Sequence, residues 1–210
     1  MLTSALRRQR DGRDEGFTLV ELLVTMFVLG ILGAMVLSIS ISALKTSRTT
    51  QNRVVGTSQA QAATERISKD LRSADPLVAA DANDVTAKVY RSGHCEIHRW
   101  YVSGGSLLQD TQKYGASTNC ATASGTPSAV TTQTLVQTVL NGATTPIFTF
   151  ARWDTTANPP ALFTMPAPVP AANVSLVDRV TVVIDASQPE NHAPVVVQSA
   201  VDLRNVVTNS

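Results

Sequence analysis

The sequence has little charge, few aromatic residues and only two cysteines. Charged residues make up 16% of its 210 residues, and 17 Lys and Arg against 16 Asp and Glu give a formal net charge of +1. This balance excludes the broad basic field of a typical nucleic-acid-binding protein. Two cysteines exclude a disulfide scaffold, although they can form one bridge. The length fits one globular domain plus a membrane segment, and it excludes a large multidomain enzyme.

The usual motifs of catalysis and phosphate binding are also missing. The sequence contains no glycine-rich phosphate loop, no Ser-His-Asp order and no zinc signature. We therefore expect no enzymatic activity and no cofactor.

One long apolar run stands near the amino terminus. Residues 17–37 contain a single charged residue, Glu21, and apolar character continues to Leu44. About 20 apolar residues are enough for a helix to cross a bilayer. The charged leader, residues 1–16, holds four arginines, and three basic residues follow the run. This count weakly favours a cytoplasmic amino terminus and an extracytoplasmic carboxyl-terminal domain.

The start of this run differs from a secretory signal peptide. A secretory signal has an apolar core of about 7–15 residues without an acid, followed by a small-residue cleavage site. Here a carboxylate, Glu21, lies at bilayer depth, which costs roughly 2.5–3.5 kcal/mol without a partner. A cut between Gly16 and Phe17 would free an α-amino group at Phe17. The amine of a neighbouring copy could then neutralise Glu21, which predicts side-by-side packing of such helices.

The charged leader, Gly16, Phe17, Glu21 and the apolar run together resemble the class III signal peptide of type IV pilin-like proteins. The resemblance implies that a prepilin peptidase cuts after Gly16 and N-methylates Phe17. It also implies that Glu21 aligns subunits during filament assembly. The implied partners are other pilin or pseudopilin subunits, the assembly machinery and the cytoplasmic membrane. The alternative is a one-pass anchor for an extracytoplasmic binding domain that never polymerises.

Two further features favour a particular subclass. Many major pilins carry a proline late in the apolar run, whereas this chain has none between Phe17 and Asp75. Residues 64–72 resemble the W-type minor pilins and J-type pseudopilins, as does a final strand that ends in Leu203-Arg204-Asn205. The resemblance implies a minor subunit at or near the filament tip.

Beyond the membrane segment the sequence predicts a second, amphipathic half of the helix. Apolar residues recur with helical spacing, at Ala60, Ala63, Ile67, Leu71 and Ala74. Asp75-Pro76 is expected to end the helix, because the residue before a proline disfavours helical geometry. Residues 46–59 are rich in Ser, Thr and Gln and contain Gly56, so fraying or a kink is expected there. The predicted segments are therefore 1–16, 17–44, 45–75 and 76–210.

After Pro76 the apolar pattern changes to the alternation of strands. The predicted strands are residues 85–91, 97–103, 130–140, 147–152, 180–184 and 195–204, and Gly104-Gly105 predicts a hairpin. Five prolines between Pro159 and Pro170 predict an irregular loop. A long helix followed only by strands indicates an α+β fold with an antiparallel sheet. This order resembles the pilin fold, in which the exported half of the helix packs on the sheet.

Cys95 and Cys120 both lie in the part expected to be exported. An oxidising compartment permits a bridge between them. It would close a loop of about 26 residues and contribute roughly 3–4 kcal/mol in the chain-entropy model. Two separate thiols are the alternative.

Two polar clusters have residue types suited to metals. His94, Glu96 and His98 would share one face of a strand, but surface histidines beside a structural cysteine are the favoured interpretation. The remaining histidine, His192, is distant in sequence. Asp81 and Asp84 supply too few of the six or more oxygens that calcium needs, so a solvated turn with Asn83 is favoured. We expect no metal site.

Overall fold

The computed structural model describes residues 18–116, 120, 123, 125–142, 145–187 and 194–203. The chain forms two compact units, residues 1–48 and 49–210. Helix α1 (Leu19–Arg72) contributes to both of them.

Helix α1 begins at a side-chain cap. The backbone N–H of Glu21 donates to the Thr18 carbonyl at 3.0 Å and to Thr18 Oγ1 at 3.3 Å. Thr18 is therefore the N-cap residue, and Glu21 is the third residue of the helix. Thr18 and Glu21 have the spacing of a capping box.

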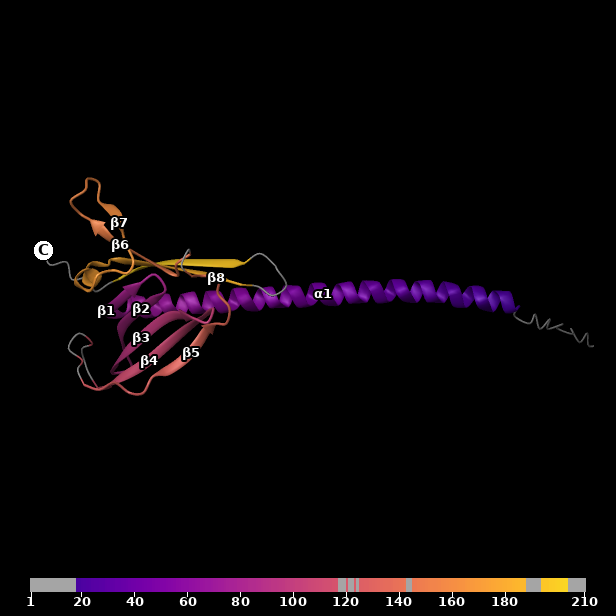
Figure 1. Ribbon diagram of the computed structural model, residues 1–210, viewed down its shortest axis with the longest axis horizontal. Coiled ribbons are helices and arrows are strands. Elements are labelled where there is room, and N and C mark those ends of the chain that lie inside the picture. The colour runs from indigo at the N-terminus through magenta and orange to yellow at the C-terminus, as the bar shows by residue number, and fades with distance from the viewer. Residues whose placement is uncertain are drawn as a thin grey trace, which may run out of the picture. The chain divides into compact units, whose positions relative to one another are not determined.

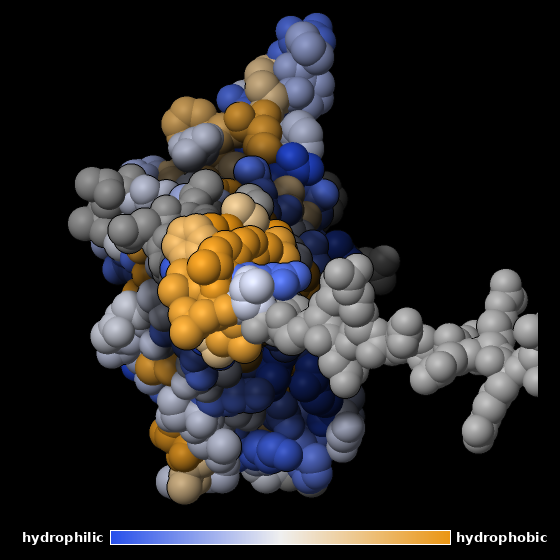
Figure 2. Space-filling view, turned by 90° about the vertical axis from the view of Figure 1, so that its right-hand side faces the viewer, coloured by the Kyte–Doolittle hydropathy of each residue, from blue (hydrophilic) through white to orange (hydrophobic). Residues whose placement is uncertain are grey.

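The first unit exposes an apolar helix surface. The most apolar 18-residue window of α1 has a mean hydropathy of 2.6, and none of that window is buried in the structure. In Figure 2 this part of α1 is the hydrophobic surface in the foreground. Its length and composition are sufficient to cross a membrane.

The expected fraying in residues 46–59 is wrong, because this segment is helical throughout. At the start of the segment a hydroxyl donates to the carbonyl one turn earlier, from Thr46 Oγ1 to Ser42 at 3.0 Å. Bonded in this way, such side chains do not draw the backbone into a non-helical conformation.

The helix ends earlier than the sequence predicted. It stops at Arg72, and Ser73 N donates to the Asp70 carbonyl. Ala74 already belongs to strand β1 (Ala74–Asp81), so the Asp75-Pro76 pair lies inside a strand instead of ending a helix. Strand β1 is at the sheet edge, and its register shifts between Ala74 and Leu77, which accommodates a residue without an N–H group.

The first sheet has five antiparallel strands in the order β1-β2-β3-β4-β5. The bounds of the other four are β2 (Asp84–Arg91), β3 (His94–Ser103), β4 (Ser106–Ala116) and β5 (Thr131–Val136). The predicted hairpin is confirmed: Gly104 and Gly105 connect β3 to β4 with φ of 57° and 75°. The strand predicted at residues 130–140 is shorter than expected.

The second sheet has four antiparallel strands in the order β7-β6-β8-β9. They are β6 (Phe148–Asp154), β7 (Ala161–Met165), β8 (Arg179–Ala186) and β9 (Val195–Asp202). The proline-rich segment was expected to be irregular, yet it contains the edge strand β7, and η1 (Ala171–Leu176) follows it. The alternation predicted for residues 195–203 is confirmed, and Arg204 lies outside the described residues.

The second half of α1 packs between the two sheets (Figure 1). Its predicted apolar face is buried, with Ile67 and Leu71 at 0% exposure. Polar contacts tie the helix to both sheets: Ser68 Oγ donates to Ser199 Oγ on β9 at 3.1 Å, and Asp70 contacts His98 on β3. The α+β class is confirmed, with two antiparallel sheets on the helix in place of the single sheet expected.

Candidate functional site

The predicted processing residues precede the described part of the chain. Gly16 and Phe17 lie outside the described residues, whereas Glu21 is in the first turn of α1 and exposed. A carboxylate at this position is stabilised by the positive end of the helix by typically 0.3–1 kcal/mol. That is less than the roughly 2.5–3.5 kcal/mol that a carboxylate costs at bilayer depth. In a bilayer, the positive end of the helix would therefore not compensate the Glu21 carboxylate by itself.

No such partner is close along the helix. Between Thr18 and Leu44 the sequence has no Lys, Arg or His, and the first cation is Lys45. At 1.5 Å per residue, Lys45 is about 36 Å from Glu21 along the helix axis. A cation for Glu21 has to come from outside this segment.

The family model for the prokaryotic N-terminal methylation motif matches residues 12–37. The chain carries a class III signal of the pilin kind. This signal implies processing by a prepilin peptidase and handling by pilin assembly machinery in general. No curated protein and no solved structure matches this chain. The matched segment contains Gly16, Phe17 and Glu21 and continues into the exposed apolar part of α1.

The predicted disulfide is confirmed in the outer unit, the name used here for residues 49–210. Cys95 and Cys120 are bonded, their Cα atoms are 5.2 Å apart and both residues are buried. The bond ties β3 to the connection that leads from β4 to β5. Because these cysteines are bridged, neither is a free nucleophile.

Replacing both cysteines with serine is expected to destabilise the outer unit by about 3.5 kcal/mol in the chain-entropy model. The bridge joins residues separated by 25 positions, and its removal frees the unfolded chain to explore more conformations. Chemical denaturation of the full chain in detergent measures the loss. Wild-type protein under a reducing agent is the control and should lose a similar amount. A variant as stable as the oxidised wild type would contradict the structural role.

The interpretation of both strand histidines as surface residues is wrong for His98. His94 is exposed, but His98 is 1% exposed and lies between two carboxylates. Its Nδ1 is 3.0 Å from Asp70 Oδ2, and its Nε2 is 2.9 Å from Glu96 Oε2. Arg91 forms an ion pair with the other oxygen of Asp70. These contacts join the end of α1 to β2 and β3.

Sequence reasoning missed Asp70 as the partner of His98. A signal was present, because Asp70 is three positions after Ile67 and next to Leu71, on the face that the apolar spacing buries. No group of three His, Cys, Asp or Glu side chains suited to a metal occurs among the described residues. The cluster is an ion-pair network that fixes the helix to the sheet.

The pKa of Glu96 is consistent with its place in this ion-pair network. Burial raises the pKa of Glu96, but its hydrogen bond to His98 and the charges of His98 and Lys113 outweigh burial and lower the pKa overall. Lys113 Nζ is 3.5 Å from Glu96 Oε1. The network therefore stabilises the ionised form of this carboxylate.

Residues of the Asp81–Asp84 turn form hydrogen bonds with other parts of the protein. Both oxygens of Asp84 accept hydrogen bonds from Arg99, and the pKa of Arg99 is raised chiefly by this pairing. The expectation of a solvated turn is incomplete, because half-buried Asn83 donates to the Gly142 carbonyl at 3.2 Å and accepts from Ile147 N at 3.2 Å. Asn83 thus links the β1–β2 turn to the segment before β6.

Proposed function

We propose that this chain is a minor pilin or pseudopilin subunit. It would be made as a single-pass precursor in the cytoplasmic membrane, with the outer unit extracytoplasmic. Prepilin peptidase would cut after Gly16 and methylate Phe17, and α1 would then carry the chain into a filament. In this proposal, residues 1–16 are the leader, 17–44 the membrane and filament-core segment, 45–75 the exported part of the helix and its end, and 76–210 the β-rich domain.

The observation that carries the proposal is Glu21 at the start of an exposed apolar helix inside the matched motif. An anchor that stays single in the lipid gains nothing from a carboxylate without a partner. A helix that packs against copies of itself meets the freed amine of the neighbouring Phe17. This argument favours a filament subunit over the alternative, a non-polymerising anchor for a binding domain.

Two features support the minor-subunit part of the proposal. The apolar part of α1 lacks the proline that many major pilins carry, and residues 64–72 resemble W-type and J-type sequences. A position at or near the tip follows from that subclass. We propose no enzymatic activity for this subunit, whose partners are other subunits and the assembly machinery.

The mature amino terminus tests the processing step. Membrane-extracted protein made with its own peptidase is expected to begin at a methylated Phe17, which leaves 194 residues (210 − 16). Intact mass and amino-terminal sequencing measure this directly. Gly16→Val places a branched side chain at the scissile bond and should leave the precursor uncut, whereas Gly30→Ala, deeper in the run, should be cut normally. A wild-type chain that begins at Met1 would refute the proposal.

A further inference from the structure

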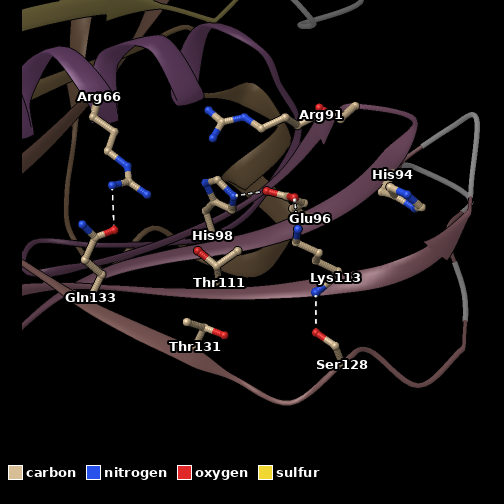
Figure 3. Close-up of a pocket in the computed structure, with 11 residues that line it drawn as sticks. Arg66, Arg91, His94, Glu96, His98, Thr111, Lys113, Ser128, Thr131 and Gln133 are labelled. Atoms are coloured by element: carbon tan, nitrogen blue, oxygen red, sulfur yellow. Dashed lines mark hydrogen bonds and ion pairs between the residues drawn. The ribbon is translucent and has the colours of Figure 1, made fainter.

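A polar cavity of about 500 Å³ opens between α1 and the first sheet. Figure 3 shows how its side chains arise from separate elements: Arg66 from α1, Arg91 from β2, Lys113 from β4 and Thr131 from β5. The lining contains no aliphatic or aromatic hydrocarbon side chain. A space of this size accommodates a small organic molecule, and the charged and hydroxyl groups of its lining favour a hydrophilic one.

The charge around the cavity is positive. Asp70 and Glu96 offset two of the three cations Arg66, Arg91 and Lys113, so the balance is 3 − 2 = +1 before His98 is counted. Arg66 is the uncompensated cation: within the described part of the chain it forms no ion pair, and it donates to the neutral Gln133 Oε1 at 2.7 Å. A guanidinium without a carboxylate, held half-buried beside a cavity, favours an anionic ligand.

Hydroxyl groups complete the set of donors. Thr111 and Thr131 line the cavity, and neither hydroxyl has a hydrogen-bond partner among the residues that the structure describes. Arg66, Arg91 and Lys113 line the cavity from three different elements. A phosphate ester offers three terminal acceptor oxygens to donors from several sides, whereas a carboxylate offers two. The volume exceeds that of a bare phosphate, and the hydroxyl groups of Ser92, Thr111 and Thr131 in the lining are able to hydrogen-bond to the hydroxyls of a sugar.

We propose that this cavity binds a small soluble phosphate ester of a polyhydroxyl compound, with Arg66, Arg91 and Lys113 holding the phosphate. Asp70 and Glu96 keep Arg91 and Lys113 in position through their ion pairs. Arg66 supplies a positive charge that neither carboxylate neutralises. This binding function goes beyond filament assembly and does not depend on it.

Titration of the full chain in detergent with glucose 6-phosphate, at constant ionic strength, tests the site by calorimetry. We expect saturable binding with a dissociation constant below about 1 mM, and no binding of glucose. Arg66→Gln is expected to weaken binding about tenfold or more, because it removes a charge-assisted hydrogen bond. Its melting temperature should stay close to that of the wild type, since the Arg66 side chain gives up only its exposed hydrogen bond to Gln133 among the described residues.

Arg152→Gln is the matched control, because it removes the same charge from an exposed position on β6 outside the cavity lining. It should leave the affinity unchanged. Binding of glucose 6-phosphate weaker than about 1 mM, equal binding of glucose, or equal losses in the two arginine variants would each overturn the proposal.

Discussion

Glu21→Ala is expected to leave cleavage after Gly16 intact while lowering incorporation of the chain into filaments by about 10- to 100-fold. A hydrogen bond between charged groups contributes roughly 1.5–3 kcal/mol, and each 1.4 kcal/mol is a factor of ten. In the proposed assembly the carboxylate of Glu21 pairs with the amine of the neighbouring Phe17, and alanine has no charge with which to form this pair. The ratio of filament-bound to membrane-bound protein, measured by quantitative immunoblotting, gives the effect.

Thr18→Ala separates this role from helix capping. The Thr18 hydroxyl accepts from Glu21 N, so its loss weakens the start of α1 by roughly 0.5–2 kcal/mol while the Glu21 carboxylate remains. If Glu21 pairs between subunits, Thr18→Ala should assemble far better than Glu21→Ala. Equal losses of incorporation in the two variants would mean that Glu21 acts through the helix cap. Normal incorporation of Glu21→Ala would show that Glu21 has no role in assembly.

The features that the sequence predicts correctly depend on local chemistry. Gly104-Gly105 predicted a hairpin because both positions need positive φ, and the structure has them at 57° and 75°. The spacing of Ala60, Ala63, Ile67 and Leu71 predicted which helix face is buried. The class III signal could be recognised because the end of the leader, the glycine, the aromatic residue and the glutamate lie within a few positions of one another, and the motif match at residues 12–37 includes them.

The features that the sequence predicts wrongly depend on contacts between distant segments. The Asp75-Pro76 pair predicts the end of the helix. In the structure Ala74 is already the first residue of β1, because β1 pairs with β2 there. Strand β7 follows two prolines and exists because β6 pairs with it. The sequence predicts His98 to be a surface residue, because its partner Asp70 is 28 positions away on another element and is not recognisable from the local sequence.

Asp70→Asn is expected to lower the free energy of unfolding of the outer unit by about 3 kcal/mol or more. Removing one partner of a buried ion pair costs roughly 3–5 kcal/mol, because the other charge stays buried without compensation. The Asp70 side chain is 1% exposed, as is that of His98, so water cannot replace the lost interaction. Asparagine keeps the shape and one acceptor, which places the expected loss at the lower end of this range.

Trp100 is a built-in reporter for this measurement. It is fully buried, and its ring centroid is 5.7 Å from that of His98, so its fluorescence follows the region that the substitution affects. Denaturant unfolding of the full chain in detergent yields the free-energy difference. Asp84→Asn is the matched control: it breaks the exposed pair with Arg99, in which both side chains are at least 36% exposed, and should cost only about 0.2–1 kcal/mol. If the two variants lose the same small amount, the Asp70–His98–Glu96 network does not hold the helix to the sheet, and the apolar face around Ile67 and Leu71 accounts for that attachment alone.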